Sequence, residues 1–351
     1  MEKNNSDLSR RRLLFGGAAV GAGALLTACT SNEAAPTPAQ TKDSGNAEGN
    51  AAPGQKVVIG FSAPAADHGW IAAITNNAKA QAQAYSDVEF KSVEAGADAA
   101  AQRAALSTLL GQKPNVIVLL PHDGKELNSF GLEAMAAGIP VVNLDRAFPD
   151  ARAYRTLIKG DNYGMGVAAA DYIITQMKVK GVTAPIIGEI AGMDELELTQ
   201  ERSKGFTDTL TAAGFKVANR RAARFTVDSG QQEAAQLLQA LPKMDALWNH
   251  DDDQGVGVLA AINQAGRSEF IMVGGAGSKQ AIETIQADNT VLKATVTYSP
   301  SMASSAISLA RLIGQNKGMS DLVELQVPKD IVLASETITK GNASSYIKLG
   351  F

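Results

Sequence analysis

Short apolar runs alternate with longer amphipathic stretches along most of the chain from Lys56 onward. An apolar run of about four to eight residues is typical of a strand buried on both faces, whereas a longer stretch with apolar positions three or four apart is typical of a helix. The pattern predicts strands over residues 57–62, 88–95, 115–120, 139–146, 185–190, 215–222, 245–250, 270–275 and 291–298. It predicts helices over residues 70–85, 98–112, 125–137, 163–177, 197–213, 230–241, 255–265 and 279–287.

This alternation sets the expected fold class. Strands that alternate with helices form parallel sheets with helices on both faces. Gly138 and Gly214 stand where a helix should end before the next strand. The two series of strands therefore predict an α/β protein with two doubly wound lobes, and the segment 154–161 between the series is a predicted crossover.

Polar and aromatic residues follow several of the predicted strands. Ligands of doubly wound sheets bind outside the carboxyl ends of the strands, so these residues form the candidate site. A hydroxyl-rich ligand suits such a set, because carboxylates accept hydroxyl protons, guanidinium donates forked hydrogen bonds and aromatic rings cover C–H faces. The residues are Asp67, His68, Trp70, His122, Asp145, Arg146, His250, Asp251 and Tyr298.

Several of these residues have structural alternatives. Asp145 and Arg146 could form a surface ion pair, although an apolar strand that ends in LDR favours a ligand role. Trp70 could belong to a helix core, and Asp251 could simply cap the next helix. Two further expectations are structural: Trp248 in the core, and Asp252 and Asp253 as caps or solvated groups.

The first residues have the pattern of an export signal. Arg10-Arg11-Arg12 precedes a Gly/Ala-rich apolar run from Phe15 to Ala28, shorter and less apolar than a membrane span of about 20 residues. The run ends in Leu26-Thr27-Ala28-Cys29, which resembles a bacterial lipobox. Residues 1–28 are therefore expected to be a signal peptide, exported by the twin-arginine or the general secretory route, and Cys29 to carry lipid. Residues 29–54 have the composition of a flexible tether.

Charge and motifs argue against other functions. The formal net charge of −4 provides no basic surface for nucleic acid. The sequence has no P-loop, no nucleophile elbow and no G-x-G-x-x-G after its first strand, so neither an enzyme activity nor a cofactor is expected. A metal site of His68, His122 and His250 stays an alternative, although the three lie on separate loops.

Five segments together resemble the periplasmic binding proteins for pentoses and hexoses, especially the ribose-binding type. They are IPVVNLDR (139–146), KGDNYGMGVAAADYI (159–173), TQERSKGF (199–206), HDDDQGVGVLAAINQAG (250–266) and IMVGGAG (271–277). The resemblance covers about residues 56–340 and implies two Rossmann-like lobes joined by three hinge crossovers. The implied lobes are residues 55–160 with 299–330, and residues 161–298 with 331–351.

The resemblance also implies ligand-binding residues on the first lobe. The family's sugar-binding Asp-Arg pair matches Asp145 and Arg146. Its Asn and aromatic pair after the first strand match Asp67 and Trp70, with only one aromatic residue kept. His122 lies near a position where the family has a polar residue after the third strand.

On the second lobe, the family's Arg, stacking Phe, Asn and late Gln fall on Gln200, Phe225, Asp251 and Tyr298. A family Asp falls on Ala276. Half of the polar contacts therefore differ, and the expected ligand is a monosaccharide or a linear polyol rather than ribose itself.

The function that the resemblance implies is capture of such a ligand between the lobes by hinge closure, and its delivery to the permease and ATPase of an ABC importer. Delivery of a sugar or autoinducer-like ligand to a sensor is the alternative. LacI-type repressors share the two-lobed fold, but an exported, lipid-anchored protein at the cell membrane does not bind DNA. A monomer is expected, because closure needs lobes that move freely.

Overall fold

The computed structural model describes residues 49–93, 95–319 and 326–351. The expected signal peptide over 1–28, the lipidated Cys29 and the expected tether as far as residue 48 lie outside the described residues. Those expectations stay predictions.

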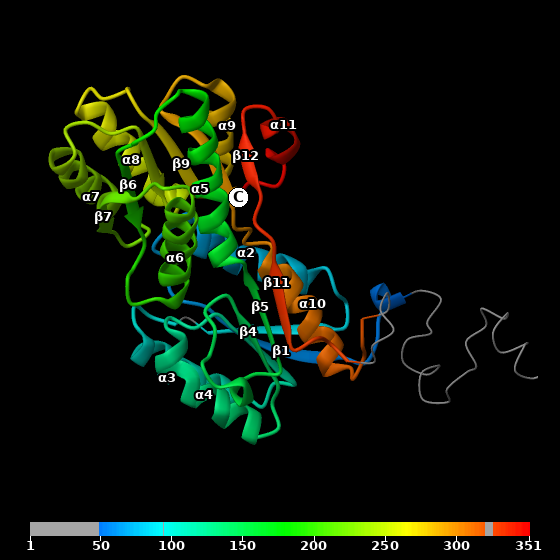
Figure 1. The fold of residues 1–351 in the computed structure, drawn as a ribbon. Coiled ribbons are helices and arrows are strands. Elements are labelled where there is room, and N and C mark those ends of the chain that lie inside the picture. The colour runs from blue at the N-terminus through cyan, green and yellow to red at the C-terminus, as the bar shows by residue number, and fades with distance from the viewer. Residues whose placement is uncertain (1–48, 94, 320–325) are drawn as a thin grey trace, which may run out of the picture. The chain divides into compact units, whose positions relative to one another are not determined.

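The first sheet has six parallel strands in the order β11-β5-β4-β3-β1-β2. Its strands are β1 (Val57–Ser62), β2 (Val88–Ser92), β3 (Val116–Leu119), β4 (Val141–Leu144), β5 (Thr156–Gly160) and β11 (Asp330–Leu333). Its helical elements are η1 (Gly49–Ala51), α2 (Gly69–Gln83), α3 (Ala99–Gly111), α4 (Gly124–Ala136), η2 (Ala151–Ala153) and α10 (Met302–Gly314). Helices α2 and α10 cover one face of the sheet, and α3 and α4 cover the other (Figure 1). This sheet and its helices form the first lobe.

The second sheet also has six strands, in the order β12-β10-β9-β8-β6-β7, of which only β12 runs antiparallel to its neighbour. Its strands are β6 (Ile187–Ala191), β7 (Val217–Ala222), β8 (Ala246–Asn249), β9 (Ile271–Ala276), β10 (Leu292–Thr297) and β12 (Thr337–Thr339). Its helices are α5 (Asn162–Val179), α6 (Glu197–Ala212), α7 (Val227–Ala240), α8 (Asp252–Gln264), α9 (Lys279–Ala287) and α11 (Ala343–Tyr346). Helices α5 and α6 pack on one face, and α7, α8 and α9 pack on the other. These elements form the second lobe.

The chain passes between the lobes three times: after β5, between β10 and α10, and between β11 and β12 (Figure 1). The predicted two-lobed α/β fold is therefore confirmed, with two corrections. The segment 154–161 is not mainly a crossover, because residues 156–160 form β5 and pair with β4 and β11. Residues 331–333 were expected in the second lobe, but β11 pairs with β5 in the first sheet, so the last crossover follows Leu333.

Aspartate side chains start several helices in both lobes. Asp98, Asp123 and Asp161 precede α3, α4 and α5, and each accepts a hydrogen bond from a backbone N–H of the first turn. Such N-caps satisfy donors that have no partner within the helix. The short strand-to-helix turns thereby hold the carboxyl ends of the strands in place, where the candidate site residues lie.

The end of the expected tether packs against the first lobe. Arg311 on α10 is buried, and its guanidinium donates to the carbonyl oxygens of Asn50 and Ala52 and to the carboxylate of Asp87. Gly54 donates its backbone N–H to the same carboxylate at 2.5 Å. The expectation of a flexible tether as far as residue 54 is therefore wrong for residues 50–54. None of the helices in the described part of the chain is both long and apolar enough to cross a membrane.

Candidate functional site

A chamber lies between the two lobes, at the carboxyl ends of their strands. It contains about 320 Å³ of space, its open mouth included. We call it the central chamber, and its lining residues come from both lobes: His68, Trp70, Asp145, Arg146, Leu198, Arg202, Phe225, Asp251, Ala276 and Tyr298. Six of the nine ligand-binding residues predicted from the sequence are among them.

The backbone is unusual at three of these lining residues. Asp145, Phe225 and Ala276 have φ values of 65°, 65° and 89°, in the region that favours glycine. The other described non-glycine residues with positive φ lie at or just after the ends of helices, where this conformation commonly terminates a helix. Left-handed backbone away from helix ends costs free energy and is concentrated at functional sites. The unusual backbone therefore marks the central chamber as the candidate functional site.

Asp145 and Arg146 follow β4 and are both buried, as a ligand role requires. The hydroxyl of Tyr298 donates a hydrogen bond to Asp145. Burial raises the pKa of Tyr298 well above its usual value, with the Asp145 charge adding to the effect, so the hydroxyl keeps its proton. Arg146 donates to the carbonyl oxygen of His122, and its buried Nε has no hydrogen-bond partner among the described residues. Its nearest acidic atom is Asp145 Oδ2, 3.9 Å away, so the two side chains form a buried ion pair.

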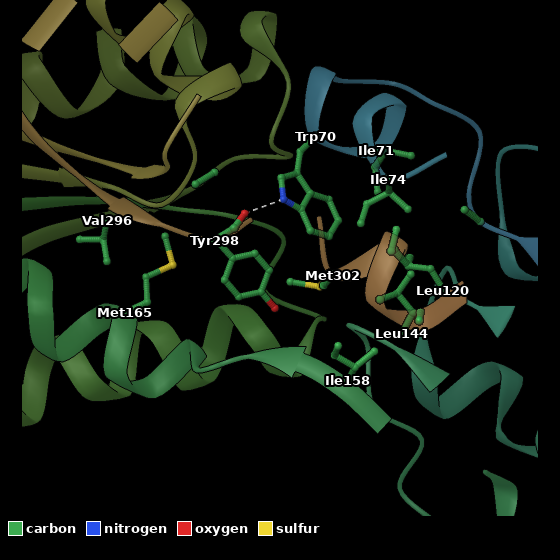
Figure 2. Close-up of a cluster of buried hydrophobic side chains, with 14 of the residues drawn as sticks. Trp70, Ile71, Ile74, Leu120, Leu144, Ile158, Met165, Val296, Tyr298 and Met302 are labelled. Atoms are coloured by element: carbon green, nitrogen blue, oxygen red, sulfur yellow. Dashed lines mark hydrogen bonds between the residues drawn. The ribbon is translucent and has the colours of Figure 1, made fainter. Parts of the chain in front are cut away.

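Aromatic rings form the walls of the chamber. The Trp70 indole N–H donates to the Tyr298 carbonyl oxygen at 2.8 Å, and the two ring centroids are 5.7 Å apart. Figure 2 shows this pair beside the apolar cluster that contains Ile71, Ile74 and Met302. Trp70 is thus packed in the core and also lines the chamber, so its position is compatible with both predicted roles. Phe225 enters from the second lobe.

Arg202 on α6 supplies the guanidinium of the second lobe, and sequence reasoning missed it. It is buried, its Nε donates to Asn162 Oδ1 at 2.9 Å, and its Nη1 donates to the His250 carbonyl oxygen at 3.3 Å. The predicted Gln200 is exposed instead, does not line the chamber, and donates to the Asp194 carbonyl oxygen at 2.9 Å. The expected ligand role of Gln200 therefore has no support in the geometry.

Close helix packing fixes the position of Arg202. A Cβ atom on Gly166 of α5 would lie 2.1 Å from the Arg202 carbonyl oxygen, and one on Gly205 of α6 would lie 2.1 Å from the Tyr163 carbonyl oxygen. Only glycine permits this approach, because real Cβ atoms do not come so close to backbone. This close approach therefore holds the Arg202 backbone against α5, and its guanidinium reaches Asn162 at the start of that helix.

Asp251 is a buried carboxylate that faces the chamber. Its Oδ1 accepts a hydrogen bond from the Gln254 N–H at 3.1 Å, as an N-cap does, so the predicted capping and ligand roles are compatible. Its Oδ2 has no hydrogen-bond partner in the described ranges. Burial raises the pKa of Asp251 to about 6, although the nearby His68 and Arg202 charges oppose this shift.

Asp252 and Asp253 are structural residues, but the expectation of caps or solvated groups is wrong for Asp252, which is buried and does not cap α8. Asp252 accepts hydrogen bonds from the backbone N–H groups of Gly275, Gly277 and Ser278, which fixes the turn after β9. Asp253 Oδ2 accepts from the Trp70 N–H at 2.8 Å and so joins the two lobes.

Two other predicted residues, Asp67 and His122, lie beside the central chamber rather than in it. They line an outer pocket that shares Arg146 with the central one. Asp67 is exposed and accepts a hydrogen bond from His68 Nδ1 at 2.5 Å. His68 itself lines the central chamber.

His250 and Trp248 belong to the core of the second lobe. Both side chains are buried, with ring centroids 4.0 Å apart, and His250 Nε2 lies 2.9 Å from the carboxylate of Glu189. His250 therefore cannot join His68 and His122 as a metal ligand. Within residues 49–93, 95–319 and 326–351, no group of three or more His, Cys, Asp or Glu side chains could hold a metal ion.

Known proteins resemble this chain in sequence and in fold. A family model described as a periplasmic binding protein domain matches residues 59–318. The ribose import binding protein RbsB of Bacillus subtilis (strain 168) is 29% identical over 210 residues, which span 60% of this chain but only 66% of that protein. The D-ribose/D-allose-binding protein of Pseudomonas aeruginosa is 26% identical over 244 residues, 68% of this chain and 75% of that protein.

The crystal structure of an ABC transporter solute-binding protein from Mycobacterium smegmatis, with bound glycerol, superposes with a TM-score of 0.74 at 25% identity. The superposition covers 83% of this chain and 97% of that one. The family model spans well over half of the chain, and the two lobes and their crossovers agree with it. The chain therefore belongs to the periplasmic binding protein domain family.

Proposed function

We propose that this chain is the sugar-binding, extracytoplasmic component of an ABC importer, and that it binds a monosaccharide or a sugar alcohol in the central chamber. The observation that carries the proposal is the composition of that chamber. Each lobe contributes one arginine and one buried carboxylate, and aromatic rings form the walls. Carboxylates and guanidinium groups fix hydroxyls, and rings pack against C–H faces.

The relatives support a small, hydroxyl-rich ligand, because their names include ribose and allose. The family Asp falls on Ala276, which keeps the proposal at the level of monosaccharides and polyols rather than ribose alone.

The lobes are proposed to close around the ligand. A ligand that contacts both lobes stabilises the closed form differentially, which is what closure requires. Contacts already join the lobes at the rim of the cleft: Trp70 N–H with Asp253, and Lys159 Nζ with Glu201 at 3.1 Å. Closed and open forms present different surfaces, which gives a permease a way to recognise the loaded protein.

A thermal-shift screen of residues 50–351 tests the binding proposal. The probes are ribose, allose, galactose, arabinose, fructose, glycerol and myo-inositol, because a ligand raises the melting temperature as its concentration exceeds Kd. We expect at least one sugar or polyol to give a concentration-dependent rise, followed by a measurable heat of binding in calorimetry. No rise with any of them, together with no heat at millimolar concentration, would contradict the proposal.

Lipid anchoring at Cys29 and delivery to a permease and ATPase belong to the same proposal. Cells grown with labelled palmitate should label the full-length chain, and Cys29→Ala should remove both the label and the membrane association. A Ser31→Ala variant, two residues away, serves as the control. Labelling that persists in Cys29→Ala would place the lipid elsewhere.

A further inference from the structure

His68, on the loop after β1, is the one histidine of the described residues that lines the central chamber. The side chain of His68 is 6% exposed, and that of its partner Asp67 is 58% exposed. His68 Nδ1 donates to Asp67 Oδ1 at 2.5 Å, so one ring nitrogen is already engaged. The Phe225 ring lies beside the imidazole with centroids 6.0 Å apart. Only Nε2 is left for a ligand in the central chamber.

The second lobe places a carboxylate in the lining of the same chamber. Asp251 lines it, and its Oδ2 has no hydrogen-bond partner in the part of the chain that the structure describes. A ligand hydroxyl can accept one hydrogen bond and donate another. A hydroxyl between His68 and Asp251 would therefore accept from Nε2–H and donate to Oδ2, which satisfies all three groups.

We propose that His68 binds the ligand, that Asp67 is the residue that positions it, and that His68 and Asp251 together hold one ligand hydroxyl from opposite lobes. This inference rests on the proposed function and deepens it. Asp67, predicted from the sequence as a ligand contact, acts instead through its neighbour.

The charges around His68 favour its protonated form. Asp67 lies on its own loop, and Asp251 and Asp253 face it from the start of α8. Arg146 at the end of β4 and Arg202 on α6 line the same chamber, and their positive charges oppose the protonation of His68. Burial lowers the pKa of His68, but the hydrogen bond to Asp67 and the three carboxylates raise it above the usual value overall.

The pH dependence of affinity follows from these two groups. Because the pKa of His68 is raised, the N–H that it donates is present at low pH and is lost as the pH rises through that pKa. Because the pKa of Asp251 is raised to about 6, its acceptor is lost as the pH falls below about 6. Affinity should therefore be greatest near and just above pH 6 and decline on both sides.

The test is calorimetry of residues 50–351 from pH 5 to 8.5, with the sugar or polyol that binds tightest among the seven probes of the screen. Asp67→Asn removes a charge that raises the pKa of His68, so it should move the alkaline decline to lower pH and weaken binding at pH 8. His68→Phe keeps the ring against Phe225 and should remove the alkaline decline. His68→Gln, with a neutral donor, should recover part of the affinity without that decline.

Asp228→Asn is the matched control, because Asp228 is an exposed carboxylate on α7 away from the chamber. It should leave the pH profile unchanged. NMR titration of His68 with and without Asp67→Asn tests the positioning role in the free protein, where we expect the variant to have the lower pKa. An Asp67→Asn profile and His68 titration equal to wild type would overturn the inference alone, whereas a wild-type protein that binds none of the probes would overturn the proposed function as well.

Discussion

Arg202 provides the sharpest test of the site, because its neighbour Gln200 was the residue expected from the sequence. In the structure Arg202 is 4% exposed, and its guanidinium lies 4.5 Å from the centroid of the Tyr298 ring. Its Nε and Nη1 are held by Asn162 and by the His250 carbonyl, so the group is fixed before a ligand arrives. The remaining N–H groups need no rearrangement to reach a ligand hydroxyl.

The magnitude follows from this geometry. Removing one partner of a buried, charged hydrogen bond costs about 2–5 kcal/mol of binding free energy. At about 1.4 kcal/mol for each tenfold change, Arg202→Met should weaken binding about 30-fold to several thousand-fold. Arg202→Lys keeps the charge but loses the planar set of guanidinium donors. Its affinity should lie between those of wild type and Arg202→Met. Gln200→Ala removes an exposed side chain on the same helix, and its affinity should stay within about twofold of wild type.

Calorimetric titration with the best ligand measures all three variants, and the melting temperature of each is recorded without ligand. Arg202→Met leaves the Asn162 and His250 acceptors without their donor, which should lower stability by about 1–3 kcal/mol without unfolding the domain. Binding by Arg202→Met at wild-type affinity would refute the reasoning. A loss in Gln200→Ala as large as in Arg202→Met would refute it equally.

Three further predictions concern other contacts of the site and the first lobe. Arg146→Ala should abolish measurable binding while the circular dichroism spectrum is kept, and retained tight binding would remove Arg146 from the site; Arg152→Ala, an exposed arginine on the same lobe, is its control. Trp70→Phe loses the N–H donated to the Tyr298 carbonyl, a hydrogen bond within the protein, and should lower the free energy of unfolding in urea by about 1 kcal/mol. Asp87→Asn should destabilise the protein by about 3 kcal/mol at pH 7, because it breaks a buried pair with Arg311. Arg311 holds the pKa of Asp87 well below its usual value, so this stabilisation is full above about pH 4 and is lost as the pH falls further; urea unfolding should show the two proteins converging in acid.

The fold was predictable because the spacing of apolar residues along a short segment is enough to identify a strand or a helix. The predicted strand 57–62 and helix 279–287 coincide with β1 and α9. The sequence predicts a crossover where β5 lies, because the pairing of β5 with β11 joins segments more than 170 residues apart. Sequence periodicity carries no information on such a partner, so the last strands of each sheet could be placed only in three dimensions.

The site was predictable where chemistry follows directly after a strand. Asp145, Arg146 and Asp251 each stand at the carboxyl end of a buried strand, where position alone identifies them. Arg202 lies within a helix, but the sequence did contain a signal. Leu198, Arg202 and Phe206 are four residues apart and share the buried face of α6, whereas Gln200 does not. An arginine between two apolar residues at helical spacing is the pattern to examine.

The distribution of charge explains why a neutral ligand suits this chamber better than an ion. Asp145 and Arg146 come from the first lobe, and Asp251 and Arg202 from the second, so each lobe brings an acid and a base, and a protonated His68 adds one positive charge. Buried charges are costly unless they are paired and hydrogen-bonded. Arg146 Nε and Asp251 Oδ2 lack partners among the described side chains, and they are of opposite kind, one donor and one acceptor. A carboxylate or phosphate would satisfy the donor and repel the acceptor, whereas hydroxyl groups satisfy both. The unfilled hydrogen bonds of the chamber therefore favour a molecule that carries several hydroxyls and no net charge.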